Sequence, residues 1–99
     1  MSWHLYLLHC ADDTLYTGIA RDVAARLFAH RAGRGARYTR GRGPLRLLAK
    51  ARCSSQSEAL RVEYAIKQLP RPRKLRLAEP RALAAFVRRY RTMKRESTD

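Results

Sequence analysis

The sequence is short of cysteine and of long apolar runs, and each shortage excludes a class of protein. Cys10 and Cys53 cannot supply a zinc quartet or a C-x-x-C redox pair, so we expect two buried, reduced thiols. No segment approaches the roughly 20 apolar residues of a membrane span. The apolar stretch WHLYLLHC lacks a basic leader and a small-residue cleavage site, and it predicts a strand rather than a signal peptide. We therefore expect a cytoplasmic protein with no membrane partner.

Acidic residues are also scarce. The chain has 22 Lys and Arg against 8 Asp and Glu, which gives a formal net charge of +14 on 99 residues. All but four of the basic residues are arginine, whose guanidinium can donate two hydrogen bonds to one phosphate. A coding bias toward arginine would not by itself create this excess over acids. The composition indicates a polyanionic partner, and nucleic acid is the one we favour.

With 45% hydrophobic residues, the chain can form one small core. The pattern predicts two strands, at 3–10 and 14–18, joined as a hairpin by a turn at Asp12 and Asp13, and a third strand at 44–53. Asp22 is a candidate N-cap, and Ser55 with Glu58 has the spacing of a capping box. The helices are expected at 23 to about 31, 55 to about 69, 73–78, and 80 to about 90.

These elements predict an α+β fold, a small three-stranded antiparallel sheet flanked by helices with an extra C-terminal helix. We expect a single domain over residues 1–90 and a frayed basic tail at 91–99. Residues 31–43 contain four of the five glycines, and this predicts an exposed basic loop. Its candidate nucleic-acid-binding residues are Arg34, Arg37, Tyr38, Thr39, Arg40 and Arg42.

The predicted hairpin and first helix would bring four polar residues close to one another. Tyr6 and Tyr16 would lie near each other if the two strands pair around the predicted turn. Arg26 and His30, four residues apart, share one side of the helix, just beside its predicted apolar arc. That arc consists of Val23, Ala24, Leu27 and Phe28.

The second helix has the same design. Glu63 borders its predicted core stripe of Ala59, Val62, Ile66 and Leu69. Each polar residue also has an ordinary explanation: the tyrosines suit strands, Arg26 could be solvated, His30 could offset a helix dipole, and Glu63 could pair with Lys67. The functional interpretation depends on the combination and on its order along the chain.

That combination resembles the GIY-YIG nuclease superfamily, and in particular its small stand-alone bacterial members. The first signature is LYL around Tyr6, and the second is YTG at 16–18. Arg26 and His30 match the helix pattern D-x-x-x-R-L-x-x-H, and Glu63 matches the glutamate of the second helix. The loop GRGARYTRGRGP is similar to that of the bacterial group and of the catalytic subunit of structure-specific endonucleases. The resemblance covers about residues 3–78.

The resemblance implies a metal-dependent endonuclease that hydrolyses phosphodiester bonds in DNA, possibly branched or single-stranded, with RNA left open. Glu63 would hold one Mg²⁺ or Mn²⁺ ion, Arg26 would brace the phosphate, and Tyr16 would act as the general base. Tyr6 and His30 would orient the water or the proton of Tyr16. The resemblance also implies that Gly18 lets the chain turn beside the substrate.

Two other functions remain open from the sequence. One is a basic module that binds DNA or RNA without cutting it. The other is a nuclease subunit that cuts only when a protein partner supplies specificity.

Overall fold

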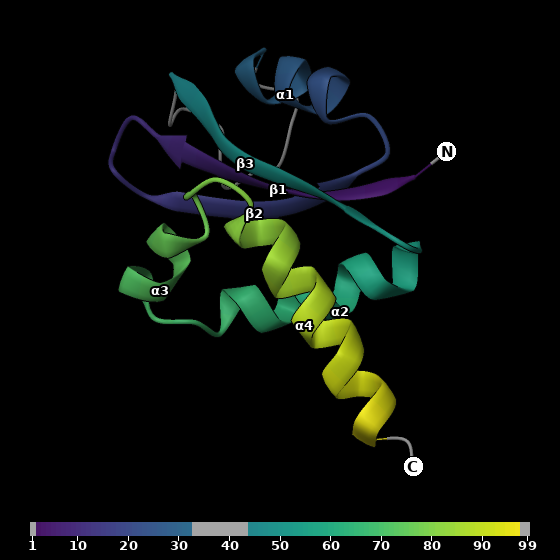
Figure 1. Cartoon of the computed structure of the whole chain (residues 1–99). Coiled ribbons are helices and arrows are strands. Elements are labelled where there is room, and N and C mark those ends of the chain that lie inside the picture. Colours follow the sequence, from purple (N-terminus) through teal and green to yellow (C-terminus); the bar gives the residue numbers. More distant parts are fainter. Residues whose placement is uncertain (1, 33–43, 98–99) are drawn as a thin grey trace.

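The structure, a computed structural model, describes residues 2–32 and 44–97. Its three strands form one antiparallel sheet in the order β2-β1-β3, with β1 at Trp3–Cys10, β2 at Leu15–Ala20 and β3 at Leu45–Cys53. The helices are α1 at Val23–Arg31, α2 at Gln56–Lys67, α3 at Arg71–Arg76 and α4 at Ala82–Ser97. Helix α1 covers one face of the sheet, and the other three helices lie on the opposite side (Figure 1). The expected α+β fold with a C-terminal helix is confirmed.

The hairpin between β1 and β2 is closed by acidic side chains, as the sequence predicted. The Asp12 carboxylate accepts hydrogen bonds from the Thr14 backbone N–H at 3.2 Å and from its hydroxyl at 2.6 Å. Asp13 has a φ of 66°, a left-handed conformation that aspartate tolerates better than most residues. This turn fixes the register of the two strands.

Alternate residues of β1 supply two separate cores, because successive side chains of a strand point to opposite faces. Leu5 and Leu7 pack with buried residues of α2 and α4. Tyr6, Leu8 and Cys10 pack on the α1 side with Val23, Ala20 and Leu45. Tyr6 therefore stands in the floor of the α1 side, with only 1% of its surface exposed.

The start of α2 carries the predicted cap and an additional contact. The Ser55 hydroxyl oxygen accepts the Glu58 N–H at 3.0 Å, so the capping prediction is confirmed. The Glu58 carboxylate accepts the Ser54 N–H at 2.8 Å and also two hydrogen bonds from the Arg91 guanidinium, at 2.7 and 2.8 Å.

The predicted end of the last helix at about Tyr90 is wrong, and the predicted fraying of residues 91–99 stays a prediction. Helix α4 continues to Ser97. Arg91 is held by Glu58, a carboxylate on another helix, and this tertiary contact has no local signature in the sequence.

The two cysteines are free and buried, as expected. Cys10 pairs with Leu45 at one end of β1, and Cys53 pairs with Trp3 at the other end. At a rise of about 3.3 Å per residue the length of the strand separates them by roughly 20 Å, far beyond disulfide reach. Within residues 2–32 and 44–97, no helix is long and apolar enough to cross a membrane.

Candidate active site

Two tyrosines come together on the α1 side of the hairpin. Tyr6 lies opposite Gly18 on β2, and Tyr16 is two residues earlier on that strand. Their ring centroids are 6.2 Å apart, as expected for diagonal neighbours across an antiparallel pair. The predicted meeting of Tyr6 and Tyr16 is confirmed.

Gly18 does not make the turn that we expected. It lies inside β2, which continues to Ala20. A Cβ atom at this position would lie 2.5 Å from the Tyr6 hydroxyl oxygen and 2.9 Å from Cε1 of Tyr16. The glycine therefore leaves room for the Tyr6 ring to cross the neighbouring strand, and this is why a side chain is missing there.

His30 completes the cluster from α1. Its ring is 3% exposed, and its Nε2 lies 2.9 Å from the Tyr6 hydroxyl in a hydrogen bond whose direction depends on the tautomer. The ring centroid is 5.9 Å from that of Tyr6 and 5.3 Å from that of Tyr16, with edge-on geometry to both. The three rings thus form one packed unit beneath α1.

The predicted apolar arc of α1 is partly wrong. Val23 and His30 face the sheet, whereas Phe28 is 66% exposed and Ala24 is also exposed. The helix is rotated so that the polar ring of His30 is buried, because the Tyr6 hydroxyl satisfies it there. His30 is therefore inside the core rather than beside it.

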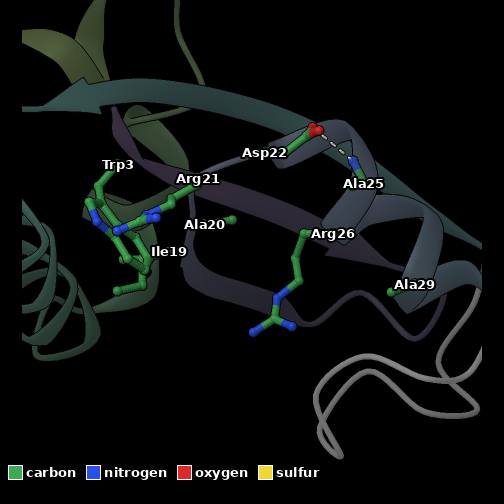
Figure 2. Close-up of a pocket in the computed structure, with 8 residues that line it drawn as sticks. All are labelled: Trp3, Ile19, Ala20, Arg21, Asp22, Ala25, Arg26 and Ala29. Carbon is green, nitrogen blue, oxygen red and sulfur yellow. Dashed lines mark hydrogen bonds between the residues drawn. The ribbon is translucent and has the colours of Figure 1, made fainter. Parts of the chain in front are cut away.

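Arg26 lies one turn before His30, on the exposed side of α1. Its charge reaches the whole cluster: it acts to lower the pKa of Tyr6, Tyr16 and His30. Figure 2 shows the Arg26 side chain extending from α1 with its guanidinium directed away from the helix. This is the arrangement expected for a group that receives an anion.

Burial works against ionisation of the two tyrosines. It raises the pKa of Tyr6 to about 12, and the neighbouring Tyr16 adds to this. Burial also raises the pKa of Tyr16, followed in importance by the negative charge of Glu63. The pKa of His30 is lowered, first by burial and then by Arg26, so its ring is neutral at pH 7. Both tyrosines keep their protons at neutral pH in the free protein.

Glu63 approaches the cluster from α2, on the other side of the sheet. Helix α2 also contacts β2, the edge strand that carries Tyr16, and the effect of Glu63 on the Tyr16 pKa shows that the two are electrostatically close. Its side chain is 18% exposed, and its Oε2 lies 3.5 Å from the Lys67 ammonium. The ordinary pairing with Lys67 is therefore present, whereas the convergence of Glu63 with the tyrosines stays a prediction.

Glu63 does not belong to a cluster of metal-ligating side chains in the described part of the chain. Among the residues that the structure describes, no three His, Cys, Asp or Glu side chains are grouped as a metal site. The loop residues Arg34, Arg37, Tyr38, Thr39, Arg40 and Arg42 lie outside the described part of the chain. The guanidinium of Arg31 donates to the Leu45 carbonyl at 3.3 Å and so ties together the two elements that flank this loop.

The sequence interpretation missed a groove beside the cluster. This open groove, of about 420 Å³, crosses the end of β2 (Figure 2). It is lined by Trp3, Ile19, Ala20, Arg21, Asp22, Ala25, Arg26 and Ala29. The hairpin register could have indicated it, because pairing of His4 with Ala20 sets Trp3 opposite Arg21.

The fold and this cluster define a GIY-YIG domain. The family model described as the GIY-YIG catalytic domain matches residues 2–76, and the chain belongs to this family. The match includes Tyr6, Tyr16, Arg26, His30 and Glu63, and it ends before α4.

The relatives of the chain are small bacterial proteins. It is 52% identical to a UPF0213 protein of Cupriavidus necator over 68 residues, which are 69% of this chain and 74% of that protein. It is 49% identical to a UPF0213 protein of Oceanobacillus iheyensis, over 77% of this chain and 88% of the relative. The solution NMR structure of the UPF0213 protein from Bacillus halodurans has a TM-score of 0.52 at 43% identity, covering 83% of this chain and 92% of that one. The expected relationship to small bacterial GIY-YIG proteins is confirmed, and none of these names states an activity.

Proposed function

We propose that this protein is an endonuclease that hydrolyses phosphodiester bonds in DNA, branched or single-stranded, with one Mg²⁺ or Mn²⁺ ion. One observation carries the proposal: Tyr16 packs against the buried, hydrogen-bonded Tyr6–His30 pair, one helical turn from the exposed Arg26. The charges of Arg26 and Glu63 act on the Tyr16 pKa in opposite directions. A binding module has no need for a largely buried carboxylate beside the tyrosines. Membership of the GIY-YIG family supports the same conclusion.

The residues present fit a single hard cation. Mg²⁺ is commonly held by one or two carboxylates together with water and substrate phosphates, and Glu63 offers one carboxylate. The negative charge of Glu63 now raises the Tyr16 pKa, so a cation bound there would oppose that effect. When bound, such an ion would polarise the scissile phosphate and neutralise part of its developing charge.

The side chains of this chain would bind the phosphate, accept the proton of the attacking water and support the residue that accepts it. Arg26 holds the phosphate with a permanent charge and acts to lower the Tyr16 pKa. Tyr16 would first release its own proton to solvent, as Arg26 and a cation at Glu63 would favour by lowering its pKa. The resulting phenolate accepts the proton of the attacking water, directly or through a second water. The Tyr6–His30 hydrogen bond fixes the surface against which Tyr16 packs. Because its pKa is about 12, Tyr6 holds Tyr16 in position and does not act as a base.

Substitution of Glu63 by glutamine tests this proposal. Glu63→Gln keeps shape and helix propensity but removes the charge that attracts a divalent ion. We expect metal-dependent cleavage of labelled single-stranded, duplex and branched DNA and RNA to fall by at least about 10²-fold, with unfolding and substrate binding nearly unchanged. Glu79→Gln, an exposed carboxylate between α3 and α4, is the matched control and should cut at the wild-type rate.

Two results would contradict the proposal in different ways. Cleavage by Glu63→Gln at the wild-type rate would remove Glu63 from the site. Wild-type protein that binds DNA tightly and cuts no substrate with either metal would favour the binding module.

A further inference from the structure

The groove in Figure 2 begins at the active site and ends on an aromatic platform. Arg26 lies at one end. At the other end the guanidinium of Arg21 lies over the Trp3 ring, with its carbon 5.2 Å from the ring centroid. The groove therefore joins the proposed phosphate-binding residue to a stacked pair of planar groups.

The Trp3 ring of the Trp3–Arg21 pair is held by its packing against the core. The Trp3 ring is partly buried against the core on the α2 side, while Arg21 is exposed just after the end of β2. A guanidinium that stacks on an indole keeps its N–H donors free at its edge. No carboxylate among the described residues forms an ion pair with Arg21 or Arg26, so both positive charges are available to an anion.

The rest of the groove favours a ligand with one flat apolar part. Between the two arginines its lining is made by small or apolar side chains, Ile19, Ala20, Ala25 and Ala29. The one carboxylate in the lining, Asp22, accepts the Ala25 N–H at 3.0 Å as the cap of α1 (dashed line in Figure 2). Its volume of about 420 Å³ lies within the range of small-ligand pockets, roughly 300–1,000 Å³.

We propose that this groove holds an unpaired nucleotide that flanks the scissile phosphate, with its base against the Trp3–Arg21 stack and its phosphate on Arg21. The inference rests on the proposed nuclease function and narrows its substrate. A base in a duplex is stacked on both faces and paired with its partner, so an unpaired base is the one that can reach this platform. The substrate is therefore single-stranded on at least one side of the cleaved bond.

Trp3 is the sole tryptophan of the chain, and its fluorescence reports directly on the groove. The test titrates the full chain carrying Glu63→Gln, without added divalent metal so that no oligomer is cut, with three oligomers of equal length. They are a single-stranded DNA, the same sequence as a blunt duplex, and a single strand of abasic sites. Binding of each is measured separately by the fluorescence anisotropy of a terminal dye.

We expect the single strand with bases to quench the Trp3 emission, whereas the duplex and the abasic strand bind with little quenching. Arg21→Gln should weaken binding of the single strand roughly tenfold, the loss expected for one stacked base and one phosphate contact. Arg61→Gln, an exposed arginine on α2, makes the same change of net charge and serves as the control. Trp3→Phe keeps an aromatic ring in the same packing and should bind the single strand more tightly than Trp3→Leu.

Unchanged Trp3 emission at saturating single strand, or equal quenching by the duplex, would overturn the inference while leaving the nuclease proposal intact. An Arg21→Gln protein that binds as tightly as Arg61→Gln would also overturn it. If wild-type protein neither binds nor cuts any of these DNAs, the proposed function fails, and the inference fails with it.

Discussion

Gly18 shows at the scale of one residue how the site depends on a missing side chain. It was expected to bend the chain, yet it lies in a regular strand opposite Tyr6. The closest approach is to the Tyr6 hydroxyl, and that hydroxyl is held by the buried His30 ring. The Tyr6 ring cannot move away without breaking this hydrogen bond. The strand glycine therefore makes space for the tyrosine pair.

We predict that Gly18→Ala destabilises the protein by about 1–3 kcal/mol, because the new methyl group overpacks against the Tyr6 ring. Cleavage should fall as well, since the Tyr6–His30 pair is displaced from Tyr16. The change in the free energy of unfolding can be measured by urea denaturation. In a Tyr6→Leu background, which lacks both the hydroxyl and the ring carbon Cζ at 2.6 Å, Gly18→Ala should cost clearly less; equal costs in the two backgrounds would contradict this account.

The contact between α2 and α4 is the main electrostatic feature at the scale of elements. Glu58 caps α2 near its start and binds Arg91 on α4 through two hydrogen bonds. The hydrogen bonds from Arg91, followed by the Ser54 N–H, lower the Glu58 pKa from 4.5 to about 2 despite its burial. The pair attaches α4, which lies beyond the GIY-YIG match, to the rest of the domain.

This contact predicts a loss of stability in acid. Because the pKa of Glu58 is lower in the folded state, its stabilisation is complete above the unfolded value of 4.5 and is lost as the pH falls toward about 2. This shift in the Glu58 pKa corresponds to at most roughly 3 kcal/mol in the free energy of unfolding. Glu58→Gln should lose about 1–3 kcal/mol at pH 7 and show a flatter stability profile below pH 4.5.

The measurement is urea denaturation of wild type and Glu58→Gln at a series of pH values. The control is Glu79→Gln, whose exposed carboxylate should leave the profile parallel to that of wild type. If Glu58→Gln and wild type lose stability in parallel below pH 4.5, another group is responsible for the acid transition.

The net charge of +14 is a property of the whole molecule, and it predicts binding that depends strongly on salt. The glycine-rich segment between α1 and β3, which the sequence predicts as a basic loop, concentrates this charge along the chain. A loop that follows the phosphate backbone should add affinity for every DNA sequence alike.

We predict that Arg37→Ala with Arg40→Ala weakens DNA binding on every sequence. It should also flatten the slope of log affinity against log salt by about 0.7–0.9 for each lost contact. Filter binding at several salt concentrations measures both effects. Arg61→Ala with Arg73→Ala removes the same charge from α2 and α3 and serves as the control. An equal change of slope in the control would mean that total charge, rather than this loop, determines binding.

The sequence by itself determined the order and type of the elements, and it predicted which residues form the site. Caps, turn residues and hydrophobic periods act between near neighbours in the chain, so the Ser55 cap, the Asp12 turn and the three strands could be predicted without a structure, although β2 extends past Gly18 to Ala20. The hairpin turn likewise fixed the register that brings Tyr6 and Tyr16 together.

Tertiary structure alone decided which face of each helix is buried and which residues distant in the sequence contact each other. His30 rather than Phe28 is buried because its Nε2 forms a hydrogen bond with the Tyr6 hydroxyl across the interface, and periodicity within α1 carries no information about that partner. The end of α4 was missed for the same reason, since Arg91 is held by a carboxylate 33 residues away in the chain. The groove of Trp3 and Arg21 exists only where α1 crosses the end of β2. Local signals specify what a segment becomes, whereas burial and pairing depend on which other segment packs against it.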